Sequence, residues 1–355
     1  MTNRWARWLR EHQPQRFNMA TKQGWDAFAQ SAPRPALDQL SRTEMHRLTD
    51  EEREDYDEAR LVWNANPPAI KTAQLNSAFS VMDQVMASNR RDGDRLRGSV
   101  VIDAAPALGK TTIATRFARE FHRKTLRRFG ATTGAGHQRL PVAFIPLDAG
   151  VTLKGLNQKI LAFYGHPGTN RATTARLGAL AVDCVRSCET QLIVLDDLHF
   201  VDFKHRNGRE VSNHLKGLAN EMPVTFIYVG VRLAEKRFFD EGLLGEDAAY
   251  AQTSRRSTRV PVAPFNHTTD AGARAWSHLL TKLEEHLLLV DSEPGMLMRQ
   301  AAELHRRTQG HIGSLTNLLD RASYLAITTG VETINPEILS MVTIDNAAET
   351  SARTA

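Results

Sequence analysis

The feature of this sequence that most constrains its fold is the stretch of residues 100–121, VVIDAAPALGKTTIATRFAREF. It begins with β-branched apolar residues, which are typical of a buried parallel strand, and it ends in a helical pattern. Between them lies a short loop that leads into Gly-Lys-Thr-Thr. A strand, a glycine-bearing loop, Lys and Thr, and a helix in this order predict a phosphate-binding loop. Backbone N–H groups of such a loop attract the β- and γ-phosphates of a nucleotide.

The predicted loop supplies both a positive charge and a metal ligand. Lys110 carries its charge toward the phosphates, and the hydroxyl group of Thr111 is suited to bind Mg²⁺. The usual pattern has a glycine where this chain has Ala104, so we expect the entry to the loop to be altered or slightly strained. We expect the nucleotide to contact seven consecutive residues: Pro106, Ala107, Leu108, Gly109, Lys110, Thr111 and Thr112.

A second informative strand is predicted within residues 191–200, QLIVLDDLHF, where four apolar residues are followed by two aspartates. This arrangement is typical of the Walker B strand, which lies beside a phosphate-binding loop. We expect Asp196 to hold Mg²⁺ together with Thr111, and Asp197 to orient or activate the attacking water. The alternative is a buried strand that ends in an acidic turn. The nearby His199 receives no role.

Length and composition limit the classes of protein to which this chain can belong. The 355 residues, 41% of them hydrophobic, are ordinary for a folded chain of two domains and an extension. No apolar run is long enough to span a bilayer, and the N-terminal sequence lacks the apolar segment of a secretion signal, so we expect a cytoplasmic protein without a membrane partner. The net charge of +5 is compatible with nucleic-acid binding but does not demonstrate it. Cys184 and Cys188 predict neither a metal site nor a disulfide framework.

Two basic segments have alternative interpretations. The N-terminal arm, residues 1–45, places Trp5 and Trp8 on one helix face among arginines. It either docks on a partner protein or nucleic acid, or folds back on its own domain. Residues 116–128 are rich in Arg, Lys and His. They form either a solvated helix face or a contact to a phosphate backbone.

The order of predicted elements resembles the AAA+ ATPases, and within them the TniB/TnsC-type ATPases of multi-component DNA transposition systems. Strands are expected at about residues 98–103, 141–147, 191–196, 223–230 and 259–263. Four segments carry the resemblance: the lead-in that precedes the loop, GKTT together with LDDLH, the strand ending at Gly230 with the arginines at 255–256, and QGHIGSLTNLLDRA near the C-terminus.

The resemblance implies an α/β fold, namely an AAA+ P-loop NTPase with a five-stranded parallel sheet, a C-terminal helical lid and an N-terminal helical extension. It also implies a division of the chain. The expected segments are a basic, Trp-containing arm (1–45), a helical lead-in (46–97), the nucleotide-binding α/β domain (98–265), the helical lid (266–345) and a disordered tail (346–355).

A protein of this type binds ATP and Mg²⁺ between the subunits of a homo-oligomer, either a ring or a filament on double-stranded DNA. Its implied partners are a transposase, which it recruits or activates at the target, and target-selection proteins. Arg256, or Arg255 beside it, matches the position of a trans-acting arginine finger. DNA contacts are expected on the basic segment 204–216 or on a second set: Arg232, Lys236 and Arg237.

Three departures from the family pattern predict slow ATP hydrolysis. Ala104 replaces a glycine, Asp197 stands where a glutamate is usual, and Val231 occupies a position that is commonly polar. The leading hypothesis is therefore an ATP-dependent transposition regulator that turns over slowly. The alternatives are a STAND-type signalling or defence NTPase, which often shares GKTT and the Asp-Asp pair, and a nucleotide-binding scaffold that never hydrolyses.

Overall fold

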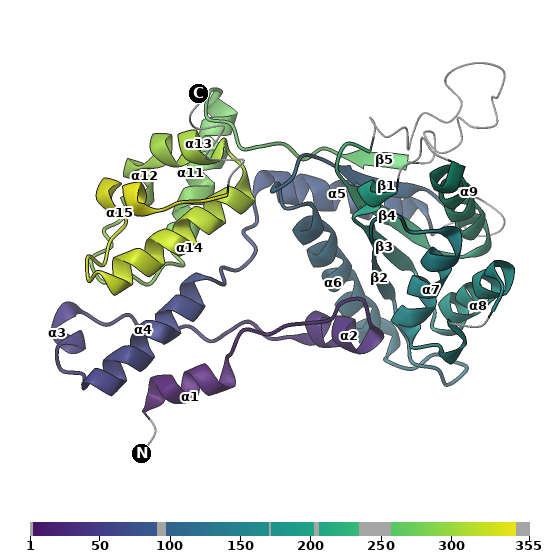
Figure 1. Ribbon diagram of the computed structural model, residues 1–355, viewed down its shortest axis with the longest axis horizontal. Coiled ribbons are helices and arrows are strands. Elements are labelled where there is room, and N and C mark those ends of the chain that lie inside the picture. The colour runs from purple at the N-terminus through teal and green to yellow at the C-terminus, as the bar shows by residue number, and fades with distance from the viewer. Residues whose placement is uncertain (1–2, 91–96, 170–171, 202–205, 234–256, 346–355) are drawn as a thin grey trace. The chain divides into compact units, whose positions relative to one another are not determined.

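The computed structural model describes residues 3–90, 97–169, 172–201, 206–233 and 257–345 (Figure 1). The chain forms two compact units. The sheet unit comprises Phe17–Ser31 and Gln74–Ala263, and the helical unit comprises Met1–Arg16, Ala32–Ala73 and Pro264–Ala355. The predicted tail, 346–355, lies outside the described residues. No described helix is long and apolar enough to cross a membrane.

The sheet unit is built on a five-stranded parallel sheet with the strand order β2-β3-β4-β1-β5. Its strands are β1 (Ser99–Asp103), β2 (Val142–Pro146), β3 (Leu192–Asp196), β4 (Thr225–Gly230) and β5 (Ser257–Val260). The first four strands are almost wholly buried, which explains their near-continuous apolar sequences. The predicted P-loop NTPase sheet is thus confirmed in strand number and direction.

The edge strand β5 differs from its predicted position. The sequence indicated residues 259–263, but the strand covers Ser257–Val260 and pairs with β1 only as far as Val260. Pro261 follows directly, and a proline has no N–H group to continue a ladder. Thr258 and Arg259 are exposed, as suits an edge strand, so this strand lacks the apolar run that located the others.

Helices cover both faces of the sheet. Those of the sheet unit are α2 (Lys22–Gln30), α5 (Ala73–Ser88), α6 (Lys110–Phe129), α7 (Leu153–Tyr164), α8 (Thr174–Ser187) and α9 (Arg206–Glu221), with the 3₁₀ turns η1 (Pro167–Thr169) and η2 (Leu198–Phe200). Figure 1 shows α5 and α6 on one side of the sheet and α7, α8 and α9 on the other. This two-sided cover buries the parallel strands and leaves their carboxyl ends for the loops.

The N-terminal arm folds back on its own chain, which was the second of its two interpretations. In the sheet unit, the fully buried Trp25 stacks on Phe144 with ring centroids 6.0 Å apart. Its indole N–H donates to Nδ1 of the buried His122 on α6 over 3.1 Å. In the helical unit, α1 (Arg4–Glu11) buries Trp5 against Tyr56, with ring centroids 5.3 Å apart. The arm's tryptophans are therefore core residues.

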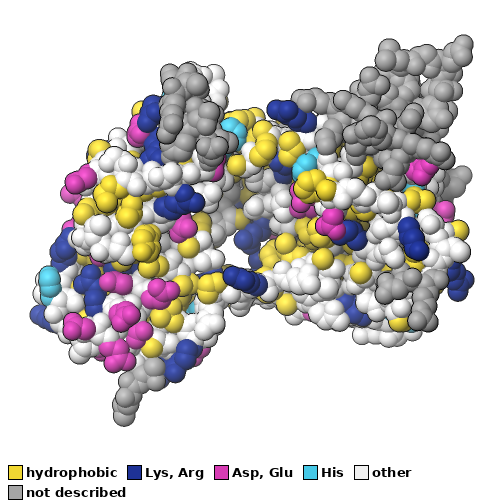
Figure 2. All heavy atoms as spheres, viewed as in Figure 1, with side chains coloured by type: hydrophobic (Ala, Val, Ile, Leu, Met, Phe, Trp, Pro, Cys, Tyr) yellow, Lys and Arg dark blue, Asp and Glu magenta, His cyan; other side chains and the backbone are white. Residues whose placement is uncertain are grey.

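The helical unit contains α1, α3 (Arg42–Met45), α4 (Asp50–Asn64), α11 (Asp270–Glu284), α12 (Met296–Arg299), α13 (Ala301–Thr308), α14 (Ile312–Thr328) and α15 (Pro336–Met341). The helix α4 begins with the capping box that Thr49 and Glu52 form. Acidic side chains fill its first two turns, and Figure 2 shows Asp and Glu gathered over this part of the unit. This acidic face is poorly suited to bind DNA phosphates.

A buried ion pair joins α4 to the loop after α14. The guanidinium of Arg60, which is fully buried, donates to both carboxylate oxygens of Glu332 over 2.7 and 3.0 Å. Arg60 also bonds to Asp57 on its own helix. A bidentate pair of this kind is stable only while both partners remain, because a single buried charge is strongly disfavoured.

We therefore expect Glu332→Gln to lower the free energy of unfolding by about 3 kcal/mol, since it leaves the Arg60 charge only partly paired. The matched control is Asp38→Asn, which removes the exposed Arg4–Asp38 pair and should cost less than about 1 kcal/mol. Urea unfolding followed by tryptophan fluorescence measures both. Equal costs for the two variants would contradict the assignment of Arg60–Glu332 as a stabilising contact.

Candidate nucleotide-binding site

The predicted phosphate-binding loop connects β1 to α6 at the carboxyl edge of the sheet. Gly109 is the N-cap of α6 and has a left-handed backbone, φ 77° and ψ 20°. The backbone N–H of Ile113 bonds to the carbonyl of Gly109 over 2.9 Å, so the helix starts directly at Lys110. The first N–H groups of a helix have no partner within it. The loop therefore presents a helix N-terminus, which attracts anions.

The backbone strain that was expected at Ala104, at the entry to the loop, is found at Ala107 instead. The backbone N–H of Ala104 bonds to the carbonyl of Gly230 over 3.4 Å, so this residue extends the pairing of β1 with β4. The described non-glycine residues with positive φ include Ala107, at 59°, and do not include Ala104. Alanine in this conformation costs about 1 kcal/mol. Replacing the usual first glycine by Ala104 is thus compatible with this loop, and the strained residue is three positions later.

Lys110 lies at the centre of the site. Its ammonium group donates to the carbonyl of Ala105 over 2.6 Å, and only 9% of the residue is exposed. Burial lowers the pKa of Lys110, while the carboxylates of Asp196, Asp103 and Asp197 favour its charged form. The charge is therefore held inside the loop, between the carboxyl ends of β1 and β3.

The last residue of β3 is the buried carboxylate of the site. Asp196 is 5% exposed, and its Oδ1 accepts the backbone N–H of Asp197 over 3.0 Å. Burial raises the pKa of Asp196 above its ordinary value, and neighbouring Asp197 adds to the rise, whereas a hydrogen bond to the Thr111 side chain opposes it. The structure thus brings together Thr111 and Asp196, the two residues predicted to hold Mg²⁺.

The donor atoms at this place fit a hard divalent cation. A hydroxyl and a carboxylate supply oxygen ligands, and Mg²⁺ in nucleotide sites takes its remaining ligands from phosphates and water. The described residues contain no group of three or more His, Cys, Asp or Glu side chains that could hold a metal without such help. Any metal bound here would accordingly depend on the nucleotide.

Asp197 differs from Asp196 in both exposure and backbone. Its side chain is 48% exposed, and its φ of 58° is in the left-handed region. Aspartate tolerates this conformation better than most residues, including glutamate. The backbone therefore gives a reason for Asp at a position where related ATPases usually have Glu. The Nδ1 atom of His199 lies 3.8 Å from Oδ1 of Asp197. The role of Asp197 in orienting or activating water stays a prediction.

Two residues at the carboxyl ends of β1 and β4 tie the site to the next loop. Asp103 and Gly230 are paired in the sheet, and Oδ1 of Asp103 accepts the backbone N–H of Leu233 over 3.0 Å. A Cβ atom on Gly230 would lie 2.6 Å from the Leu233 side chain, so a larger residue there requires that side chain to shift. Asp103 was not among the site residues predicted from the sequence. Its signal was an acidic residue at the end of a buried strand directly before the loop.

Several predicted residues lie outside the described part of the chain. These are Arg255 and Arg256, proposed as arginine fingers, and Lys236 and Arg237, proposed as DNA contacts. The basic segment 204–216 is described only in part, and most of its basic side chains are not. Arg232 is described: it is exposed, with a φ of 54°. The finger and the DNA contacts therefore stay predictions.

Comparison with known proteins gives one family and a set of related folds. The family described as Bacterial TniB protein matches residues 60–241, about half of the chain. No curated protein sequence matches. Solved structures with a similar fold include ORC1 of Aeropyrum pernix in a complex with DNA, with 17% identity, a TM-score of 0.56, and coverage of 82% of this chain and 68% of that one.

Two further archaeal structures give the same result. ORC2 of Aeropyrum pernix has 15% identity and a TM-score of 0.57, covering 80% of this chain and 69% of that one. Cdc6p of Pyrobaculum aerophilum has 14% identity and a TM-score of 0.55, covering 78% and 68%. At these identities the likeness shows the fold alone.

A substitution at Asp196 tests whether its carboxylate supports magnesium-dependent ATP binding or only ends a buried strand. Because its pKa is raised, the ionised form is less stable in the folded protein than in the unfolded chain. Asp196→Asn keeps an oxygen for the Asp197 N–H and should change the free energy of unfolding at pH 7 by less than about 1 kcal/mol. It should nevertheless weaken magnesium-dependent ATP binding at least about tenfold.

Urea unfolding and equilibrium binding of a fluorescent ATP analogue, with Mg²⁺ and with EDTA, provide the two readouts. Loss of stability with unchanged nucleotide binding would favour the alternative interpretation, an acidic turn that only ends a buried strand.

Proposed function

The chain belongs to the bacterial TniB family, and we propose that it is an ATP-dependent, DNA-binding AAA+ regulator of DNA transposition. In this proposal it assembles on duplex DNA as a ring or filament and recruits or activates a transposase at the target. The observation that carries the proposal is the meeting of Lys110, Thr111 and Asp196 beside the N-terminus of α6.

Four described residues of the site have a role in binding ATP in this proposal. The backbone N–H groups around Gly109 hold the phosphates, and Lys110 exchanges its bond to the Ala105 carbonyl for a phosphate oxygen. Thr111 and Asp196 hold Mg²⁺, which neutralises charge on the phosphates. The buried Asp196 carboxylate supports this assignment, because a raised pKa marks a charge that lacks sufficient compensation until a cation binds.

Hydrolysis in this proposal is slow. Asp197 is one methylene shorter than the glutamate that is usual in AAA+ proteins. Its left-handed backbone fixes the direction in which its side chain leaves the main chain. An attacking water held at a longer distance is poorly oriented, which lowers the rate. ATP would then act mainly as a switch for assembly, and its hydrolysis as a timer for disassembly.

The proposed oligomer places ATP between neighbouring subunits. Arg256, or Arg255, would reach the phosphates of the next subunit and complete the site in trans. This gives a physical reason for ATP-dependent assembly, because the nucleotide's negative charge attracts the neighbour's arginine.

Binding to duplex DNA is supported by charge and by the related folds. The chain has a net charge of +5, and the solved structures of Aeropyrum ORC1 and Drosophila ORC contain those proteins bound to DNA. For this chain we propose the contacts on the basic segment 204–216 or on Arg232, Lys236 and Arg237. Arg232 lies directly before Leu233, whose backbone N–H donates to Asp103. The STAND-type alternative shares the GKTT and Asp-Asp motifs, but the family match favours the transposition regulator.

The coupling of nucleotide to DNA tests this proposal. Duplex binding by the full chain should strengthen at least about tenfold when a non-hydrolysable ATP analogue and Mg²⁺ are added, and it should fall steeply with salt. Lys110→Ala should abolish the effect of nucleotide. Lys282→Ala, which removes an equal charge from the exposed Lys282–Glu285 pair on α11, should preserve it. Fluorescence anisotropy of a labelled duplex measures the affinity with and without nucleotide, its dependence on salt, and the affinities of the two variants.

Absence of duplex affinity in the ATP-loaded protein at low salt would contradict the transposition proposal. Affinity that is equal with and without nucleotide would retain DNA binding but exclude an ATP-controlled assembly.

A further inference from the structure

The basic block of α6 has two faces, and one of them is already occupied by the N-terminal arm. Arg119 donates from Nε to the carbonyl of Ala29 over 3.2 Å and from its terminal nitrogen to Oγ of Ser31 over 3.1 Å. Arg123 donates to the carbonyl of Ser31 over 3.0 Å. These cations meet the C-terminal end of α2, where a helix carries partial negative charge. This face of the block is therefore structural.

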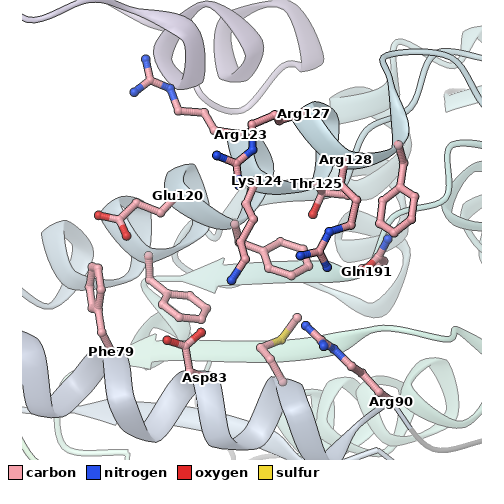
Figure 3. Close-up of a pocket in the computed structure, with 14 residues that line it drawn as sticks. Phe79, Asp83, Arg90, Glu120, Arg123, Lys124, Thr125, Arg127, Arg128 and Gln191 are labelled. Carbon is pink, nitrogen blue, oxygen red and sulfur yellow. The ribbon is translucent and has the colours of Figure 1, made fainter.

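The other face of the block borders a pocket between α5 and α6 (Figure 3). Lys124 and Arg128 come from α6, and Arg90 follows α5. Figure 3 shows these three side chains directed into the same space, and Arg123 and Arg127 of α6 also line the pocket. None of the three side chains forms a hydrogen bond or an ion pair with a described residue. All three residues are exposed to solvent, where their mutual repulsion is weak, and a bound anion would be attracted to each of them.

Four phenylalanines and one methionine form the apolar part of the pocket wall, beside nine polar or charged residues. Phe79 and Met86 of α5 face Phe117 and Phe121 of α6, and the rings of Phe79 and Phe117 meet edge to face with centroids 5.5 Å apart. The pocket has a volume of about 660 Å³, which is within the range of small-molecule sites.

The other polar residues of the lining include two carboxylates, Asp83 and Glu120, and the amide of Gln191. Asp83 accepts hydrogen bonds, and the Gln191 amide both donates and accepts. They can pair with the amino and carbonyl groups of a heterocycle, as the cations pair with phosphate.

We propose that this pocket is a second nucleotide-binding site, which takes a free nucleoside polyphosphate. The nucleobase packs on the phenylalanine rings, and the phosphates meet Lys124, Arg128 and Arg90. An inorganic anion would not use the aromatic walls. A duplex, whose bases are stacked inside it, presents phosphates alone and would not use them either.

The pocket is separate from the phosphate-binding loop. Lys110 begins α6, and Lys124 lies 14 residues later on the same helix, a distance of about 21 Å along the axis at 1.5 Å per residue. Gln191 precedes β3, and Asp196 ends it, so the two sites lie toward opposite ends of this strand. The proposal consequently does not depend on the function assigned to Lys110 and Asp196.

The experiment uses the full-length Lys110→Ala protein, in which binding at the loop is disabled. Fluorescently labelled ATP and GTP are titrated, and we expect saturable binding of one nucleotide per chain to remain. Adding Lys124→Ala and Arg128→Ala should lower this affinity at least about tenfold. Adding Arg116→Ala, on the same helix but not lining the pocket, should change it less than about twofold.

A second readout does not depend on those substitutions. Free nucleotide should protect Lys124 from acylation in the Lys110→Ala protein, and Arg90→Glu, on the opposite wall, should remove the protection. The proposal is overturned if Lys110→Ala binds no nucleotide saturably, or if Lys124 and Arg128 matter no more than Arg116. It is also overturned if a single-stranded oligonucleotide protects Lys124 while free nucleotides do not. None of these readouts involves duplex DNA, so they are independent of the transposition test.

Discussion

The buried carboxylate of Asp196 is the constraint on which the account of this protein depends. An ionised group at 5% exposure, next to a second aspartate, is unfavourable unless a cation compensates it. The fold brings two sources of compensation to it, the Thr111 hydroxyl and the Lys110 charge. Parallel strands that all end at one edge make this possible, because β1 delivers the loop and β3 delivers the aspartate to the same place.

The helix α6 links the parts of the sheet unit. Its N-terminus forms the phosphate-binding loop, its middle anchors the arm through Arg119 and His122, and its C-terminal half borders the basic and aromatic pocket. A rigid helix of 20 residues keeps these places in fixed relation. Under the two proposals, nucleotide at the loop and nucleotide in the pocket both contact the helix that also anchors the arm.

The features that could be predicted from the sequence are those that a single short segment of residues indicates by itself. The four buried strands and the loop are predictable because apolar runs and Gly-Lys-Thr report their own surroundings. The edge strand was misplaced because its exposed residues carry no such run, and Pro261 ends it. The strain at Ala107, the contact from Asp103 to Leu233 and the division of the basic block into two faces depend on long-range packing. A sequence pattern does not report packing between distant segments.

The central claim is that a nucleoside triphosphate and its magnesium ion lie between Lys110 and Asp196. The most direct measurement is an electron cryomicroscopy structure of the full chain with a non-hydrolysable ATP analogue, Mg²⁺ and duplex DNA. We expect the phosphates at the N-terminus of α6, with the metal between Thr111 and Asp196. Density for nucleotide away from this loop, or a metal held by other residues, would contradict it.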